Sequence, residues 1–164
     1  MAGSRIDTSA RGDVKQTMVI LRVILAGIFL YSGLIKASSS AQFAIALAPF
    51  TFLPETWIRP LSILLPVCEI VAGLLILVSP TKHIGAGVIF ALCILFATVL
   101  GWALANGIIV SCSCFGQDDQ PSAMKMALAL GRDLFLAGMA LVIILERRST
   151  RRSGIRRLGN LFPL

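Results

Sequence analysis

The feature that most constrains this chain is an apolar run from Ile84 to about Ala105 that contains no charged side chain. A helix needs roughly 20 apolar residues to cross the hydrocarbon core of a bilayer. We therefore expect a membrane-spanning helix here. The composition agrees, because 57% of the 164 residues are hydrophobic, which excludes an ordinary water-soluble enzyme.

Three other runs are long enough to span a membrane. The first covers Thr17 to about Ile35 and carries one charge, Arg22, which we expect to extend to the cytoplasmic surface. The second covers Pro60 to about Val78, and the last covers about Ser122 to Leu145. The predicted fold class is thus an all-α membrane protein, a four-transmembrane-helix bundle over residues 17–145.

The first apolar run also has features of a secretory signal peptide. Basic residues precede the run, and small residues follow it from Ala37 to Ala41. However, the run is long for a signal peptide, and Lys36 stands where a cleavage region is usually uncharged. We therefore favour a retained membrane span.

The segments outside the spans are polar or short. Residues 1–16 have almost no apolar content, which predicts a disordered cytoplasmic tail. Between the first two spans, Phe43 and Phe50 belong to an apolar face that predicts a short helix on the membrane surface, ended by Pro54. Pro66 predicts a kink in the second span. Residues 146–164 form a basic cytoplasmic tail.

The positive charges predict the topology. If the N-terminus is cytoplasmic, the cytoplasmic segments hold ten basic residues and the other side holds three. The ten are Arg5, Arg11, Lys15, Lys82, Arg147, Arg148, Arg151, Arg152, Arg156 and Arg157, and the three are Lys36, Arg59 and Lys125. Cytoplasmic loops carry the excess of Lys and Arg. We therefore expect both termini in the cytoplasm and the loop between the last two spans outside.

The net charge of +7 suggests nucleic-acid binding at first sight. Six arginines, however, crowd into the tail between Arg147 and Arg157, directly after an apolar run. Such a juxtamembrane cluster is typical of a contact with the bilayer surface. The expected partner is therefore the lipid bilayer, and no nucleic acid.

The extracytoplasmic loop contains the pair Cys112 and Cys114 in a C-x-C arrangement. Thiols on this side of a membrane are usually oxidised. Two cysteines one residue apart close only a small, strained ring, and strained, exposed disulfides exchange readily. A structural disulfide stabilises by closing a long loop. The pair therefore indicates a redox centre, and these two cysteines are our candidate catalytic residues.

Three other interpretations of the pair stay open. With Met124 or Met126 the cysteines offer soft ligands for Cu(I), although no histidine lies on that side of the membrane. One cysteine alone could form a lasting disulfide with another protein. The pair could also be two incidental loop cysteines. We predict no other metal site.

Cys68 and Cys93 lie near the middle of the second and third spans. A second dithiol at this depth could relay electrons through the membrane. Buried cysteine is more commonly a small hydrophobic residue, so the relay is the less favoured of the two hypotheses.

Ionisable residues inside the spans are the other candidate site. Glu69 in the second span and Arg132 with Asp133 in the last fall at similar depth. A charge at this depth is costly unless it is paired or faces a polar cavity. We expect a Glu69–Arg132 ion pair, which either fixes the register of two helices or takes part in proton or substrate handling.

Together these features resemble the MauE branch of the DoxX-like membrane proteins, a branch named for methylamine utilisation. The matching stretches are SGLIK (32–36), LPVCEIVAGLLIL (65–77), SCSCFG (111–116) and GRDLFLAG (131–138). Motif order, number of spans and loop position all agree. Where family members often have Arg-Asn in the last span, this chain has Arg132-Asp133.

The resemblance implies thiol-disulfide chemistry beside an extracytoplasmic thioredoxin-like protein, in the maturation of disulfide-bearing exported proteins. It also implies a bacterial plasma membrane. DoxX-like proteins serve as subunits of larger assemblies too, so the competing hypothesis is a non-catalytic anchoring or assembly subunit. The sequence identifies no cofactor, and no quinone motif is readable.

Overall fold

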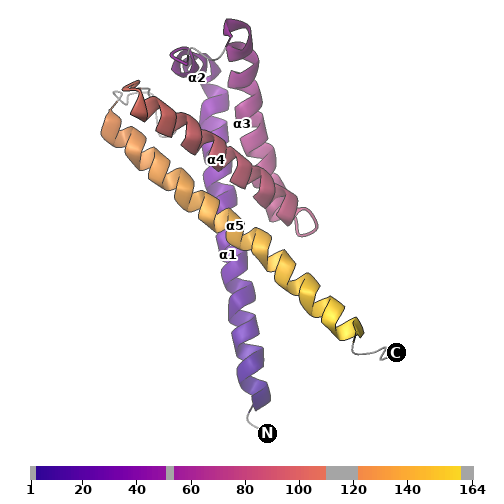
Figure 1. The fold of residues 1–164 in the computed structure, drawn as a ribbon. Helices are drawn as coiled ribbons and strands as arrows, with labels where there is room; N and C mark the ends of the chain where they lie inside the picture. The colour runs from indigo at the N-terminus through magenta and orange to yellow at the C-terminus, as the bar shows by residue number, and fades with distance from the viewer. Residues whose placement is uncertain (1–2, 51–53, 110–121, 160–164) are drawn as a thin grey trace.

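The computed structural model describes the backbone of residues 3–50, 54–109 and 122–159, with side chains over 16–50, 54–109 and 122–146. These residues form five α-helices (Figure 1). They are α1 (Gly3–Ser38), α2 (Ser40–Leu47), α3 (Glu55–Leu77), α4 (Lys82–Ala105) and α5 (Ala123–Gly159). No strand occurs among the described residues.

The all-α fold and its four long apolar helices are confirmed. The segments long and apolar enough to cross a membrane are Gln16–Ser38, Glu55–Leu77, Lys82–Ala105 and Ala123–Glu146. They belong to α1, α3, α4 and α5, and each overlaps almost completely with one of the four predicted runs. The candidate cysteines Cys112 and Cys114 lie between α4 and α5, outside the described residues.

The boundaries of the first helices differ from the sequence-based expectation. α1 already begins at Gly3, in the segment where we expected disorder. Once an apolar span has nucleated a helix, each further residue adds one backbone hydrogen bond, so a polar segment can continue it. The short second helix was expected, and here Pro54 stands at the N-cap of α3 with extended backbone. Pro60 therefore lies inside α3 instead of starting it.

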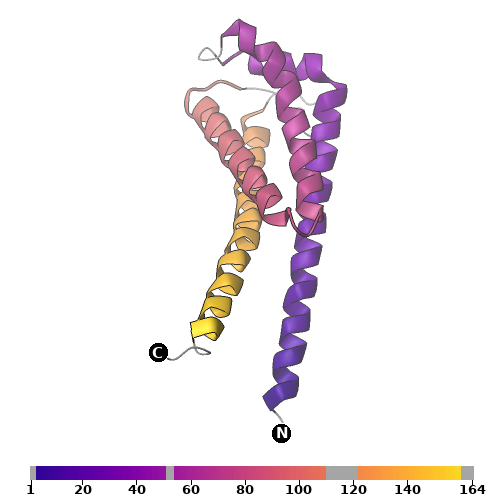
Figure 2. The ribbon, with the colours of Figure 1, turned by 90° about the vertical axis from the view of Figure 1, so that its right-hand side faces the viewer.

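The four long helices are arranged as two pairs. α1 packs along α3 and α4 packs along α5, while α3 and α4 join the pairs. The pairs cross at an angle in Figure 1 and separate toward the end where α2 lies in Figure 2. We call this end the α2 end. The opposite end, where α3 turns into α4, is called the turn end, and both termini extend beyond it (Figure 1).

At the turn end the helices approach each other very closely. A Cβ atom added to Gly85 of α4 would lie 2.5 Å from the backbone nitrogen of Ile76 in α3. Arg22 of α1 donates hydrogen bonds from Nε to the carbonyl of Ile76, at 2.9 Å, and from Nη2 to the carbonyl of Leu77, at 2.8 Å. Arg22 therefore caps the C-terminus of α3 instead of extending to the surface, which places its positive charge at the negative end of the helix dipole.

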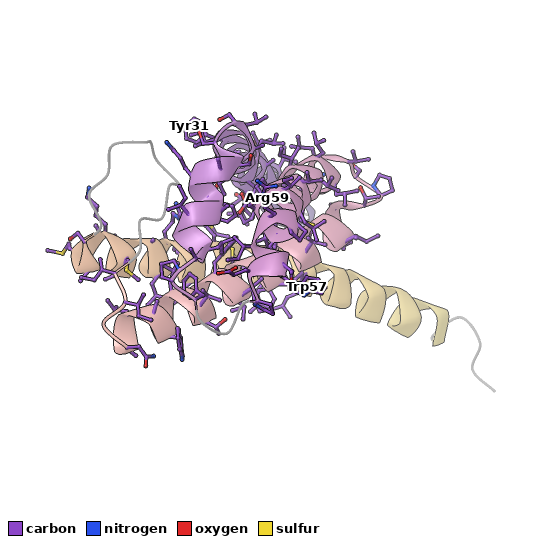
Figure 3. The ribbon with its side chains drawn as sticks, turned by 90° about the horizontal axis from the view of Figure 1, so that it is seen from above. Tyr31, Trp57 and Arg59 are labelled. Atoms are coloured by element: carbon purple, nitrogen blue, oxygen red, sulfur yellow. The ribbon has the colours of Figure 1, made fainter. Side chains whose placement is uncertain are left out.

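The outer surface of the bundle is apolar, as expected for helices that contact lipid. Many large side chains are exposed along all four spans. Among them, Tyr31 and Trp57 are more than half exposed, and Trp57 stands near the exposed Arg59 at the start of α3 (Figure 3). Aromatic and basic residues of this kind are enriched where a helix leaves the hydrocarbon.

Candidate functional site

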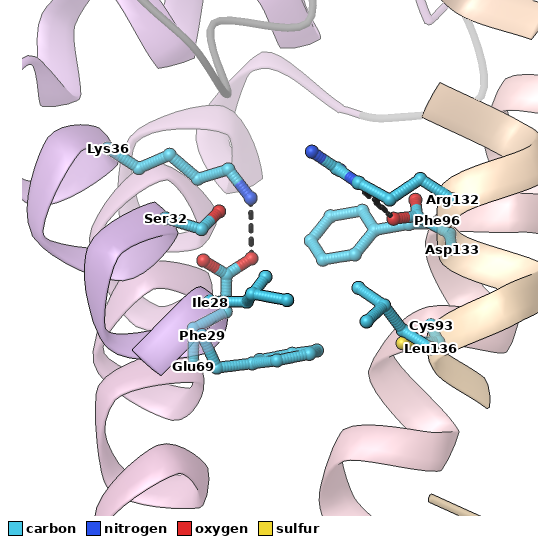
Figure 4. Close-up of a pocket in the computed structure, with 10 residues that line it drawn as sticks. All are labelled: Ile28, Phe29, Ser32, Lys36, Glu69, Cys93, Phe96, Arg132, Asp133 and Leu136. Carbon is cyan, nitrogen blue, oxygen red and sulfur yellow. Dashed lines mark hydrogen bonds and ion pairs between the residues drawn. The ribbon is translucent and has the colours of Figure 1, made fainter. Parts of the chain in front are cut away.

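A small cavity with charged walls lies between the two helix pairs (Figure 4). All four long helices contribute to it. Its lining residues are Ile28, Phe29, Ser32 and Lys36 of α1, Glu69 of α3, Cys93 and Phe96 of α4, and Arg132, Asp133 and Leu136 of α5. We call it the polar cavity. Its volume is about 20 Å³, which is room for about one water molecule.

The shortest contact in the cavity is an ion pair between α1 and α3. Lys36 Nζ donates a hydrogen bond to Glu69 Oε1 at 2.5 Å. Both residues are buried, with 4% of Lys36 and 1% of Glu69 exposed. The expected partner of Glu69 was Arg132, which lines the same cavity, but the ion pair of Glu69 is formed with Lys36, and Arg132 pairs with Asp133.

The sequence places Lys36 for this role through its neighbours in the SGLIK stretch. Ser32 and Lys36 are four residues apart, so they share one face of α1. Gly33 on the same helix faces α3, where an added Cβ would lie 3.1 Å from the Pro66 carbonyl and 3.3 Å from Glu69 Cβ. The missing side chain thus lets α1 approach the turn of α3 that carries Glu69.

Lys36 is not evident as a site residue when depth is taken from the ends of upright spans. Counted in this way, Lys36 lies at the outer surface and Glu69 well inside. In the structure α3 begins at Glu55, and its first turns lie farther toward the α2 end than the last turn of α1 (Figure 1). The signal that could have identified Lys36 is the Ser32, Gly33, Lys36 face.

Two aromatic rings also contact Lys36. Its Nζ lies 4.5 Å from the ring centroid of Phe96 in α4 and 5.6 Å from that of Phe43 in α2. A cation within about 6 Å of an aromatic ring is attracted by the negative face of the ring. Lys36 therefore connects α1 with α2 and α4 as well as with α3.

The second ion pair is on the opposite wall of the cavity. The Arg132 guanidinium donates to Asp133 Oδ1 from Nη2 at 3.0 Å and from Nε at 3.2 Å. Asp133 is 5% exposed. Figure 4 shows the guanidinium extending from α5 above Phe96, toward the side where Lys36 lies. The cavity thus contains two cations and two carboxylates.

One carboxylate oxygen in this cluster is unsatisfied. Glu69 Oε2 is buried and receives no hydrogen bond from any described residue. A buried carboxylate oxygen without a donor is costly, and the cost is higher in a low-dielectric setting. The cavity can therefore bind a hydrogen-bond donor or a proton at this oxygen.

The two intramembrane cysteines are placed differently. Cys93 is 1% exposed and lines the polar cavity, whereas Cys68 is half-buried and packs against the apolar core. Neither forms a disulfide within the described part of the chain. The electron relay suggested for this pair stays a prediction.

The C-x-C sequence lies outside the described residues, between the end of α4 and the start of α5. α4 ends at Ala105 and α5 begins at Ala123, both at the α2 end. The chain between them carries Cys112 and Cys114. Both termini lie beyond the turn end (Figure 1). The described residues that flank the candidate cysteines in sequence therefore lie at the opposite end of the spans from the start of α1.

Comparison with known proteins gives one family. The family model described as "Methylamine utilisation protein MauE" matches residues 14–146, which include all four candidate spans and the polar cavity. Methylamine utilization protein MauE of Paracoccus denitrificans is 30% identical over 132 residues, which cover 78% of this chain and 69% of that protein. No solved structure matches the chain.

Proposed function

We propose that this chain, which belongs to the MauE family of methylamine utilisation proteins, is a membrane thiol-disulfide exchange protein. Its reacting groups are the thiols of Cys112 and Cys114. Its partner is a thioredoxin-like protein on the extracytoplasmic side of a bacterial plasma membrane. The exchange serves the maturation of disulfide-bearing exported proteins.

The observation that supports this proposal most is the end of the bundle at which α4 ends and α5 begins. The end of α4 and the start of α5, which flank the C-x-C sequence in the chain, both lie at the α2 end, opposite the start of α1. The ten-to-three distribution of basic residues assigns the termini to the cytoplasm. Cys112 and Cys114 then belong to the oxidising compartment, where a dithiol can cycle with exported partners.

The exchange is a two-electron reaction in two steps. The thiolate of one cysteine attacks a sulfur of the partner's disulfide, which forms a mixed disulfide and releases one partner thiolate. The second cysteine then attacks the mixed disulfide, which closes the Cys112–Cys114 bond and releases the other partner thiolate. Two electrons pass from this chain to the partner, the two released thiolates take up protons, and the reverse steps carry electrons the other way.

Trapping of the mixed disulfide tests the reaction. With Cys112→Ser or Cys114→Ser, the remaining thiol can attack but no second thiol resolves the adduct. One of the two variants should accumulate a partner adduct that disappears on reduction and that mass spectrometry identifies. The double variant should show no adduct and should lose disulfide-dependent maturation of the client. Cys68→Ser is the matched control, which should form no adduct and retain maturation.

If neither single variant gives an adduct and the double variant still supports maturation, the exchange hypothesis is wrong. The anchoring or assembly subunit then takes its place, and the protein should instead copurify with its complex irrespective of Cys112 and Cys114.

A separate measurement tests the sidedness. A membrane-impermeant thiol reagent applied to intact cells after mild reduction should label Cys112 or Cys114, while Cys93, buried in the bundle, stays protected. Labelling only from the cytoplasmic face of inverted vesicles would contradict both the topology and the exchange reaction.

A further inference from the structure

The carboxylate of Glu69 is held in an asymmetric way. Oε1 accepts the hydrogen bond from Lys36, whereas Oε2 receives none from any described residue, although Glu69 is 99% buried. Glu69 lines a polar cavity with room for about one water molecule. The residue that carries the unsatisfied oxygen therefore lines a space that is polar and small.

We propose that the polar cavity is a proton-binding site, in which one water molecule hydrogen-bonds to Glu69 Oε2 and delivers a proton to that oxygen. The ligand class is water and its protonated form. This inference does not depend on Cys112 and Cys114, and it goes beyond the proposed exchange reaction.

The lining of the cavity suits a water molecule. A buried water is held by two to four polar partners. Besides Glu69, the lining offers the hydroxyl of Ser32 on α1 and the carboxylate of Asp133 on α5. The remaining lining is mostly aromatic and aliphatic, and the volume of about 20 Å³ excludes a larger polar ligand.

The charges around the cavity explain why Glu69 is the group that takes the proton. The ionisable residues that face it are Lys36 from α1, Cys93 from α4, and Arg132 with Asp133 from α5. Asp133 already accepts two hydrogen bonds from Arg132 on one oxygen. Glu69 accepts its hydrogen bond from Lys36 on Oε1, and Oε2, which has no hydrogen-bond partner among the described residues, lies toward Ser32 in Figure 4.

Protonation of Glu69 removes the countercharge of Lys36, so the cation needs other stabilisation. The rings of Phe96 and Phe43 supply it, since their centroids lie 4.5 and 5.6 Å from Lys36 Nζ. In the proton transfer, an O–H bond of the protonated water breaks and one forms at Oε2. Water stays behind, no electron moves, and the cluster gains one positive charge.

Infrared difference spectroscopy of the whole protein in lipid nanodiscs tests the proposal. A protonated carboxyl group has a C=O stretching band that the ionised form lacks. On acidification, the intensity of this band should rise in the wild type by the contribution of one more carboxyl group than in Glu69→Gln. The band should also shift in D₂O. Glu146→Gln is the matched control: Glu146 pairs with Lys82 at 3.6 Å toward the turn end and should leave the Glu69 band unchanged.

The bound water has its own signature. Replacing H₂¹⁶O by H₂¹⁸O should shift an O–H stretching band of the wild type that responds to pH, and Glu69→Gln should abolish that response. Identical spectra for wild type and Glu69→Gln over the whole pH range would overturn the proposal. If the glutamine variant does not fold, Glu69→Asp replaces it. A pH-dependent carboxyl band with the same frequency in Glu69→Asp as in the wild type would then overturn the proposal.

Discussion

The turn end and the polar cavity hold the helices together in opposite ways. At the turn end α3 and α4 meet backbone to backbone at Gly85 and Ile76, and Arg22 satisfies the last carbonyls of α3. At the polar cavity the two helix pairs line a space with charged side chains, and Lys36 of α1 contacts the Phe96 ring of α4 across it. One region is tightly packed by small residues, and the other is joined by charge.

The connections between the helices explain this difference. Only Val78 to Thr81 separate α3 from α4, so the chain itself keeps the two helices close and a glycine suffices for tight packing. At the level of the cavity, α1 and α5 are distant in sequence and contact each other little. There the charges select partners, and Lys36 joins α1 to α3, α4 and α2 at once. We therefore expect packing changes to act at the turn end and charge changes at the cavity.

The largest effect is expected at the cavity. Lys36→Met leaves the buried Glu69 carboxylate without its cation, which should lower the free energy of unfolding by about 3–5 kcal/mol. The measurement is denaturant unfolding in micelles, followed by the fluorescence of Trp57 and Trp102. The exposed Lys125→Met, near the start of α5, is the matched control and should change the unfolding free energy by less than about 1 kcal/mol.

The double variant Lys36→Met with Glu69→Gln sharpens this result. Because the glutamine removes the uncompensated charge, the double variant should recover part of the loss, and the double-mutant cycle should give a coupling energy above about 1 kcal/mol. Purely additive losses would mean that the ion pair of α1 and α3 does not form.

A smaller effect is expected from the turn end. The added methyl group of Gly85→Ala meets the backbone of Ile76, which cannot rotate away, and this should cost about 1–3 kcal/mol in the same unfolding measurement. Gly87→Ala is the matched control two residues along α4, where an added Cβ has no described atom within 4 Å. That variant should be neutral or slightly stabilising. Equal losses for both variants would contradict the close helix approach.

The smallest of the three effects is expected from the cap of α3. Arg22→Met removes two hydrogen bonds to the last carbonyls of that helix, which water can partly replace because Arg22 is only half-buried. The expected loss is about 1–2 kcal/mol. The exposed Arg59→Met should give no comparable loss, and an Arg22→Met variant as stable as the wild type would exclude the cap.

The sequence predicts the spans better than it predicts the site. Hydrophobic run length decides whether a helix can cross a bilayer, and all four runs are helices here. The partner of Glu69 depends instead on how far α3 is shifted along α1, and run length contains no information on that shift. The two helices approach closely at Gly33, and the pairing of Lys36 with Glu69 depends on this relative placement.

The start of α1 and the position of Arg22 also depend on more than run length. The helical start of α1 follows from helix propagation, which composition alone does not report. Arg22 was expected at the surface because its acceptors, the carbonyls of Ile76 and Leu77, lie far away in sequence. Cys112 and Cys114 lie outside the described residues, so their role stays a proposal.

A redox titration of the purified protein tests that central proposal most directly. Membranes or nanodiscs are equilibrated with dithiol and disulfide buffers, free thiols are alkylated, and mass spectrometry counts them at each potential. The account predicts a reversible two-electron couple at Cys112 and Cys114, with a tenfold change in ratio per about 30 mV, retained in the Cys68→Ser/Cys93→Ser variant. A protein in which these two thiols do not titrate together, or in which the couple persists after both are replaced by serine, would contradict it.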